Sequence, residues 1–152
     1  MLDLYEELAS IVDALENHGV PYALCGGIAM SVHGFTRATV DIDLFLPAEA
    51  AERAEAVVAP LGYTFPANPM NFSSGAVQIR RVSKIDLNDG DLLMLDLLLV
   101  TPATQEVWLS REVRMWRARP IQVVSREGLI TLKRFRSSMQ DLADIERLEG
   151  GE

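Results

Sequence analysis

The spacing of hydrophobic residues predicts an amphipathic helix at the start of the chain. Apolar side chains recur there every three or four residues, at Leu4, Leu8, Ile11, Val12 and Leu15. Asp3, with Glu6 three residues later, forms a capping-box pattern, and Gly19 is a suitable end. The apolar segment 21–25 that follows predicts a short buried strand.

The pattern then predicts an alternation of strands and helices. We expect helices over 28–33, 48–59, 126–137 and 139–149, with a helical segment near 103–110. Ser125 is suited to cap the helix over 126–137. We expect strands over 39–46, 76–87 and 91–100, a loop or irregular edge over 62–75, and two short strands broken near Pro120. The strands expected over 76–87 and 91–100 flank Asn88-Asp89-Gly90, a strong hairpin signal.

This order describes an α/β (α+β) fold, a mixed β-sheet flanked by helices. At 152 residues the chain is predicted to form a single domain over 1–152, with the C-terminal helices 126–149 as part of it. The apolar run 92–100 contains Asp96 and is too short to cross a bilayer, and the first residues lack the pattern of a signal peptide. The single cysteine requires no oxidising compartment. We therefore expect a cytoplasmic protein without a membrane partner.

Charge is distributed unevenly along the chain. The formal net charge is −8, which disfavours indiscriminate binding to nucleic acid. Residues 1–60 hold ten acids and two bases, whereas residues 111–136 hold eight bases and two acids. The basic segment either faces a polyanion such as a nucleotide or RNA, or forms an ordinary solvated surface.

Two aspartates near residue 42 are the first candidates for chemistry. Asp41 and Asp43 alternate with apolar residues in a predicted strand, so both side chains would lie on the same face. Neighbouring carboxylates repel each other and are costly to bury unless a cation neutralises them. Carboxylates at this spacing suit Mg²⁺. The alternative is a strand with one solvated face.

The glycine pair Gly26-Gly27, followed by Arg37-x-Thr39-x-Asp41-Ile42-Asp43-Leu44, resembles the signature of the nucleotidyltransferase superfamily that includes DNA polymerase beta. The pattern is most similar to the minimal and abortive-infection-type members. The resemblance implies a polymerase-beta-like fold and transfer of a nucleoside monophosphate from an NTP, with Mg²⁺ or Mn²⁺, to a hydroxyl of a protein, RNA or small molecule. It also implies an antitoxin or a homodimer partner as possibilities. The alternative is a non-catalytic member that binds a nucleotide or a partner protein.

The resemblance also implies a third acid on a neighbouring strand. Asp96 is the candidate, because an unpaired carboxylate within the run LLMLDLLLV would be expensive to bury. Together with Asp41 and Asp43 it would form the catalytic and metal-binding set. A partly exposed edge position is the other interpretation of Asp96, and Asp86 is the next candidate.

Further residues are expected to contact the phosphates of the nucleotide. Gly26 and Gly27 would let the backbone approach a triphosphate closely. Many relatives have serine at the second position, so Ser31 or backbone amides would substitute here. Thr39 would steady a carboxylate or touch phosphate, and Arg37 would bind phosphate or form a structural salt bridge.

The segment LITLKRFRSSMQDLADIERL resembles the closing helical motif of the same relatives. Carried over by position, Lys133 would reach the triphosphate, and Asp141 or Asp144 would orient it. A solvated helix face is the alternative for all three. Cys25, next to the glycines, is predicted to be a small buried residue and not a nucleophile.

Overall fold

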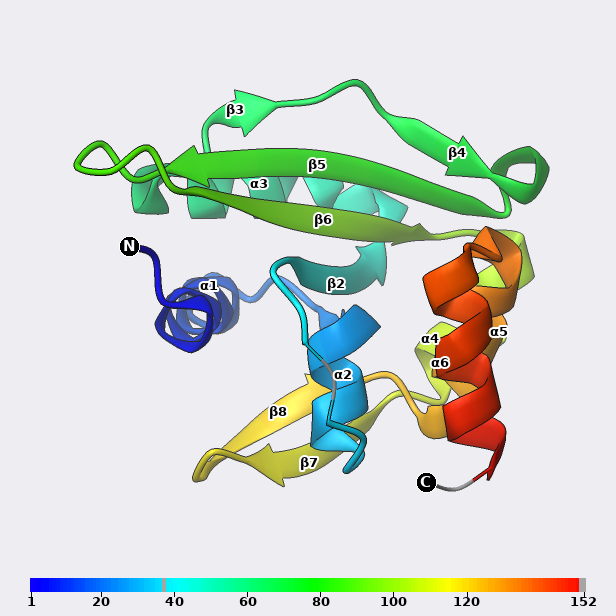
Figure 1. Cartoon of the computed structure of the whole chain (residues 1–152). Coiled ribbons are helices and arrows are strands. Elements are labelled where there is room, and N and C mark those ends of the chain that lie inside the picture. Colours follow the sequence, from blue (N-terminus) through cyan, green and yellow to red (C-terminus); the bar gives the residue numbers. More distant parts are fainter. Residues whose placement is uncertain (37, 151–152) are drawn as a thin grey trace.

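The structure is a computed structural model, and it describes residues 1–36 and 38–150 (Figure 1). The α-helices are α1 (Leu4–Asn17), α2 (Gly26–Val32), α3 (Ala51–Val58), α4 (Gln105–Leu109), α5 (Arg126–Arg136) and α6 (Met139–Gly150). Short 3₁₀ turns cover Ala48–Ala50, Ala59–Leu61, Ser73–Gly75 and Pro102–Thr104. The strands are β1 (Ala23–Cys25), β2 (Ile42–Pro47), β3 (Phe65–Pro66), β4 (Met70–Phe72), β5 (Val77–Ile85), β6 (Leu92–Val100), β7 (Glu112–Trp116) and β8 (Arg119–Val123).

The strands form one mixed sheet in the order β3-β5-β6-β2-β1-β8-β7, and β4 also pairs with β5. The pairs β2–β6 and β1–β8 are parallel, and the other pairs are antiparallel. Central β2 is almost entirely apolar, and Ile42, Leu44, Phe45 and Leu46 are buried, as expected for a strand covered on both faces. The predicted mixed sheet flanked by helices is therefore confirmed.

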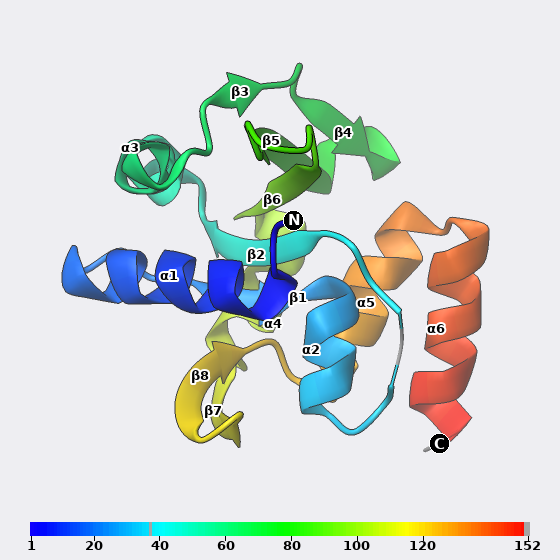
Figure 2. The same cartoon turned by 60° about the vertical axis from the view of Figure 1, so that its left-hand side comes forward.

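The helices lie on both sides of this sheet. Figure 2 shows α1 and α3 on one side, and α2, α5 and α6 on the other. Helix α1 buries the apolar stripe that its spacing predicts, at Leu8, Ile11, Val12 and Leu15. Asp3 caps it by accepting hydrogen bonds from the backbone N–H groups of Tyr5 and Glu6. No helix in residues 1–36 or 38–150 is long and apolar enough to cross a membrane.

Two details of the sequence prediction were wrong. The strand expected over 39–46 begins only at Ile42, and Val40, an apolar residue within the expected strand, is 76% exposed. The cause is tertiary: beyond Cys25 the chain turns into α2, so no neighbouring β1 strand continues beside residues 38–41. The break near Pro120 was also misplaced, since Pro120 lies within β8 and the turn is at Arg117 and Ala118.

Candidate active site

A row of four side chains crosses the centre of the sheet. Asp43 on β2 is the register partner of Asp96 on β6, and on the other side it is opposite Cys25 of β1. Asp96 is in turn opposite Arg81 of β5. Residues in register on adjacent strands project from the same face of a sheet. The structure thus brings Asp43 and Asp96, which are 53 residues apart, side by side on the face covered by α2 and α5.

Gly26 fits closely against Asp43. Its φ is +70°, a left-handed conformation that side chains rarely adopt, and it follows directly after the register partner Cys25. A Cβ atom at Gly26 would lie 2.2 Å from Oδ2 of Asp43. Any side chain at this position would therefore displace the carboxylate, so the glycine is needed for the site and not only for the turn.

The carboxyl group of Asp43 is strongly perturbed. Burial, followed by the negative charge of Asp96 and to a lesser degree that of Asp41, raises its pKa to about 7, against the opposing effect of Arg136 and Lys133. The same burial, together with Asp43, raises the pKa of the Cys25 thiol. The negative charges of Asp96 and Asp41 thus act on the Asp43 carboxyl group, and the positive charges of Arg136 and Lys133 offset them only in part.

Arg81 provides the charge that balances Asp96. Its Nε donates to Oδ1 of Asp96 at 2.6 Å and its Nη2 donates to Oδ2 at 3.0 Å, while Asp96 is only 2% exposed. A guanidinium group that donates two hydrogen bonds to one carboxylate fixes both the position and the plane of that carboxylate. Sequence reasoning missed Arg81, although counting outward from a hairpin turn centred on Asn88 and Asp89 places it opposite Asp96.

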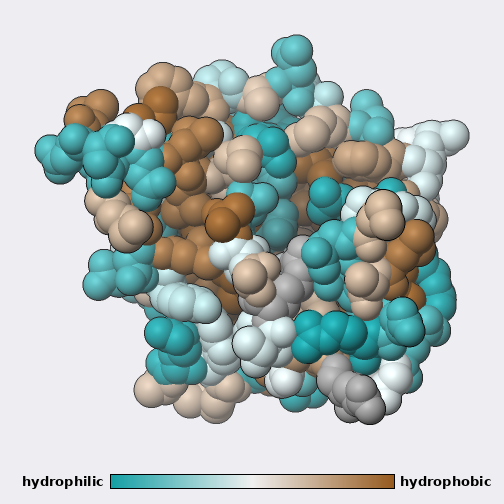
Figure 3. Space-filling view, in the orientation of Figure 1, coloured by the Kyte–Doolittle hydropathy of each residue, from teal (hydrophilic) through white to brown (hydrophobic). Residues whose placement is uncertain are grey.

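Asp41 lies just before β2 and not within it. The hydroxyl of Thr39 donates to the backbone carbonyl of Asp41 at 3.3 Å and so supports the loop before β2, while its contact with a carboxylate or phosphate stays a prediction. The two residues line a hollow of about 390 Å³ with Tyr5, Ala38 and Val40. Figure 3 shows hydrophobic residues gathered on this side of the molecule, over the N-terminal end of α1 and the β5–β6 hairpin.

Lys133 is buried and held by acidic residues of α6. Its Nζ donates to Oδ2 of Asp144 at 3.0 Å and lies 3.9 Å from Oδ1 of Asp141. Asp144 also accepts from Gln140 at 2.8 Å. Asp141 accepts from the hydroxyl of Ser138 at 2.6 Å at the start of α6. The predicted partnership of this lysine with the two acids is therefore present, and it joins α5 to α6.

Lys133 also borders the row of Cys25, Asp43, Asp96 and Arg81. Together with Cys25, Gly26, Asp43 and Arg136 it lines a narrow space between α5 and the sheet. Arg136 follows Lys133 by three residues on α5, so the two share one helix face. Sequence reasoning named Lys133 and missed Arg136, although this spacing is visible in the sequence.

Two other predicted phosphate contacts remain predictions. Ser31 lies in the last turn of α2, one turn further from the sheet than Gly27, which is buried at the first turn. Arg37 lies outside the residues that the structure describes. The backbone at Gly26 and Gly27 begins α2 directly beside Asp43, as the sequence suggested.

The donor set suits a hard divalent cation. Carboxylate oxygens are the ligands that Mg²⁺ prefers, and the mutual repulsion seen at Asp43 is what a cation would relieve. Within residues 1–36 and 38–150, however, no three Asp, Glu, His or Cys side chains surround one point closely enough to hold a metal ion as they stand. In the structure Arg81 takes up the charge of Asp96, and Asp41 lies on the loop before the strand.

Comparison with known proteins identifies the family to which this site belongs. The model of the aminoglycoside-2''-adenylyltransferase family matches residues 7–127. The chain belongs to this family. The matched range includes the glycine pair, all three aspartates and Arg81, whereas most of α5 and all of α6 lie outside it. No curated protein matches the chain in sequence.

Solved structures share the fold of this adenylyltransferase family member at low sequence identity. ANT(2'')-Ia in complex with adenylyl-2''-tobramycin superposes with a TM-score of 0.62 at 20% identity, over 93% of this chain and 84% of that chain. The lincosamide antibiotic adenylyltransferase LnuA, bound to lincomycin, superposes with a TM-score of 0.58 at 19% identity, over 95% of each chain. A protein from Thermotoga maritima described as a nucleotidyltransferase superposes with a TM-score of 0.57 at 18% identity, over 96% of this chain and 88% of that chain. The predicted nucleotidyltransferase fold is therefore confirmed.

Proposed function

We propose that this chain is a nucleotidyltransferase that moves a nucleoside monophosphate from an NTP to a hydroxyl group of a small antibiotic-like molecule. One observation carries the proposal: Asp43 and Asp96 are neighbours on parallel strands, directly beside the glycine turn at Gly26. Membership of the aminoglycoside-2''-adenylyltransferase family supports a small-molecule acceptor. So do the two structural relatives described with tobramycin and lincomycin products or ligands.

In this reaction the acceptor oxygen forms a bond to the α-phosphorus while the bond from that phosphorus to the bridging oxygen breaks. Pyrophosphate leaves with the electron pair, and the hydroxyl proton passes to a carboxylate, for which Asp96 is the candidate. Asp41, Asp43 and Asp96 would hold Mg²⁺, which when bound neutralises phosphate charge and orients the reacting oxygens. Arg81 keeps Asp96 in one orientation through its two hydrogen bonds.

The acceptor would enter beside Asp41. The hollow of about 390 Å³ there is lined on one side by the ring of Tyr5, which is 38% exposed, and on the other by residues 38–41. An aromatic wall next to an acidic group suits a ring-shaped acceptor whose hydroxyl points toward the aspartates. The size of the hollow fits one ring system of an antibiotic and does not require a protein surface.

The test is an assay of pyrophosphate release with Mg²⁺, each of the four NTPs, and either tobramycin or lincomycin, followed by mass spectrometry of the acceptor. We expect pyrophosphate and an acceptor heavier by one nucleotidyl group, and neither with the Asp43→Asn or Asp96→Asn protein. Radiolabelled NTP with a cell extract tests the protein and RNA acceptors, including those of a toxin–antitoxin role. Label on protein or RNA with no modified antibiotic would refute the small-molecule proposal.

A further inference from the structure

Most basic side chains of the segment 111–136 are already engaged within the protein. Six of its eight basic residues donate a side-chain hydrogen bond to a neighbouring group: Arg111, Arg114, Arg119, Arg126, Lys133 and Arg134. Arg117, on the β7–β8 turn, stacks over Tyr5 at 4.0 Å. This segment is therefore an internally satisfied surface, which disfavours a continuous RNA-binding face.

Arg136 differs from these seven residues. The Nε atoms of Arg136 and Arg119 are both buried and make no hydrogen bond. Arg119 is nevertheless engaged through its Nη2, whereas no side-chain hydrogen bond or ion pair of Arg136 occurs among the described residues. Its guanidinium lies over the ring of Phe72 at 5.5 Å, a contact that leaves its N–H groups unused. A buried cationic donor without an acceptor is costly, so such a group is expected to have an acceptor from outside the chain.

The position of Arg136 indicates what that acceptor is. Arg136 lines the narrow space that also includes Gly26, Asp43 and Lys133. Its positive charge acts on Asp43 more strongly than that of Lys133 does. The space holds only about 20 Å³, little more than one water molecule, so a ligand would lie at its mouth and not inside it.

Lys133 is not equivalent to Arg136. Its ammonium group is bonded to Asp144 and lies near Asp141, both of which are buried, so this cation already has its counter-charges. Pulling Lys133 out toward a ligand would leave those carboxylates buried and unpaired, which costs several kcal/mol. Arg136, on the same helix face, can bind an anion without breaking any ion pair.

We infer that Arg136 is the side chain that binds the outer phosphates of the NTP and the pyrophosphate that leaves, whereas Lys133 acts as a structural ion pair behind it. A planar guanidinium donates two parallel hydrogen bonds to phosphate oxygens, and its charge offsets the charge that develops on the leaving pyrophosphate. The inference rests on the proposed function, because it concerns the same site. It assigns the phosphate role to a residue that the family resemblance did not indicate.

The test is titration calorimetry of the full chain with ATP, inorganic tripolyphosphate and AMP, all in the presence of Mg²⁺. Arg136→Gln is expected to weaken ATP and tripolyphosphate binding at least about tenfold and to leave AMP binding unchanged, because AMP lacks the outer phosphates. Arg136→Lys should recover part of the loss. The matched control is Arg134→Gln, two residues earlier on α5, which removes only an exposed ion pair with Glu149 and should bind all three ligands normally.

The outcomes distinguish failure of this inference alone from failure of the proposed function. If wild-type protein binds ATP and Arg136→Gln binds ATP and tripolyphosphate within twofold of wild type, Arg136 is not the phosphate residue and the proposed function stands. If wild-type protein binds neither ATP nor tripolyphosphate, both ideas fail. Unchanged AMP affinity in Arg136→Gln shows that the variant is folded, and Arg136→Lys provides a second, more conservative test.

Discussion

At the scale of single residues, the site depends on the absence of a side chain at Gly26. Gly26→Ala should be destabilising for two reasons: its φ of +70° and the 2.2 Å approach of the new Cβ to Asp43. The left-handed conformation alone costs an ordinary residue roughly 1–2 kcal/mol. Gly34→Ala is a matched control, because Gly34 has a φ of +92° and nothing within 4 Å of its Cβ position.

We therefore expect Gly26→Ala to lose clearly more stability than Gly34→Ala in urea unfolding, and to lose Mg²⁺-dependent nucleotide binding as well. Only the first variant moves the Asp43 carboxylate. Equal losses of stability in the two variants, with nucleotide binding retained in both, would show that the close approach to Asp43 has no functional role.

The carboxyl group of Asp43 should make stability depend on pH. Its pKa of about 7 in the folded protein lies above the ordinary value of 3.8, so the folded state holds this proton more tightly than the unfolded chain does. This contribution is complete below pH 4 and is lost as the pH rises toward and through 7, with a total of about 4 kcal/mol.

Asp43→Asn removes this contribution to the pH dependence, because the amide resembles the protonated acid. We expect the free energy of unfolding, measured in urea with EDTA, to be the same for the variant and the wild type near pH 4. At pH 8 the variant should be more stable. The control is Asp13→Asn, because the side chain of Asp13 is 60% exposed and is paired with Arg119. In this variant the free energy of unfolding should change with pH as it does in the wild type. A wild-type slope that persists in Asp43→Asn would assign the titration to another group.

At the scale of elements, the β7–β8 hairpin has a turn that its sequence does not favour. Arg117 and Ala118 have φ values of 50° and 64°, and two successive left-handed residues usually include glycine or asparagine. Ala118→Gly should therefore raise the free energy of unfolding by about 1 kcal/mol. The same change at Ala9, inside α1, should lower it by about 1 kcal/mol. Destabilisation by both substitutions in thermal unfolding would contradict the turn geometry.

This turn also shows which elements the sequence could predict. Helices α1, α5 and α6 were predicted almost to the residue, because their caps and apolar stripes are local signals. The long hairpin of β5 and β6 was predicted from its turn residues. The turn at Arg117 was missed because neither residue there has turn-forming character. The start of β2 was missed because it depends on where α2 replaces a neighbouring strand.

The same distinction applies to the site. Asp43 was chosen with Asp41 as a pair of acids that follows the glycine pair, and Asp96 as the third acid that the resemblance implied, because it lies within an apolar run. The sheet places Asp43 and Asp96 side by side. Arg81 depends on hairpin register, and the role of Arg136 depends on knowing that Lys133 is already paired. Residue type and spacing thus identified the acids as candidates. Arg81 and Arg136 could be identified only once the structure showed which charged groups are already paired.

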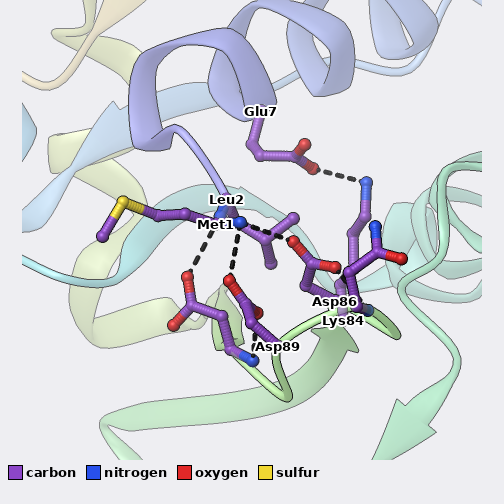
Figure 4. Close-up of polar contacts among 8 residues, drawn as sticks. Met1, Leu2, Glu7, Lys84, Asp86 and Asp89 are labelled. Carbon is purple, nitrogen blue, oxygen red and sulfur yellow. Dashed lines mark hydrogen bonds and ion pairs between the residues drawn. The ribbon is translucent and has the colours of Figure 1, made fainter.

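At the scale of the whole molecule, polar contacts join the N-terminal segment to the hairpin of β5 and β6. Figure 4 shows the ammonium group of Met1 facing Asp86 and Asp89, at 2.8 and 2.7 Å, and Glu7 of α1 facing Lys84 of β5. Asp86, the alternative candidate for the third acid, is thus engaged at the hairpin turn. The side chain of Met1 is 93% exposed, so solvent screens its contacts, and acetylation of this amine should not measurably change stability.

Glu7 is the more important link, because its contacts are partly buried. Its Oε1 accepts from Nζ of Lys84 and from the hydroxyl of Tyr63, both at 2.9 Å, so one carboxylate joins α1, β5 and the segment before β3. Glu7→Ala leaves both donors without this acceptor and should cost about 1–3 kcal/mol in urea unfolding. Glu6→Ala, one residue earlier and exposed, should cost far less.

A double-mutant cycle decides whether the loss comes from this network. Lys84→Met removes the partly buried ammonium, so adding Glu7→Ala to it should cost less than Glu7→Ala costs alone, by roughly 1 kcal/mol of coupling. Such coupling would mean that α1, on the face of the sheet away from Asp43 and Asp96, helps to hold β5, the strand that carries Arg81 and through it orients Asp96. Purely additive losses would instead separate the packing of α1 from the geometry of the site.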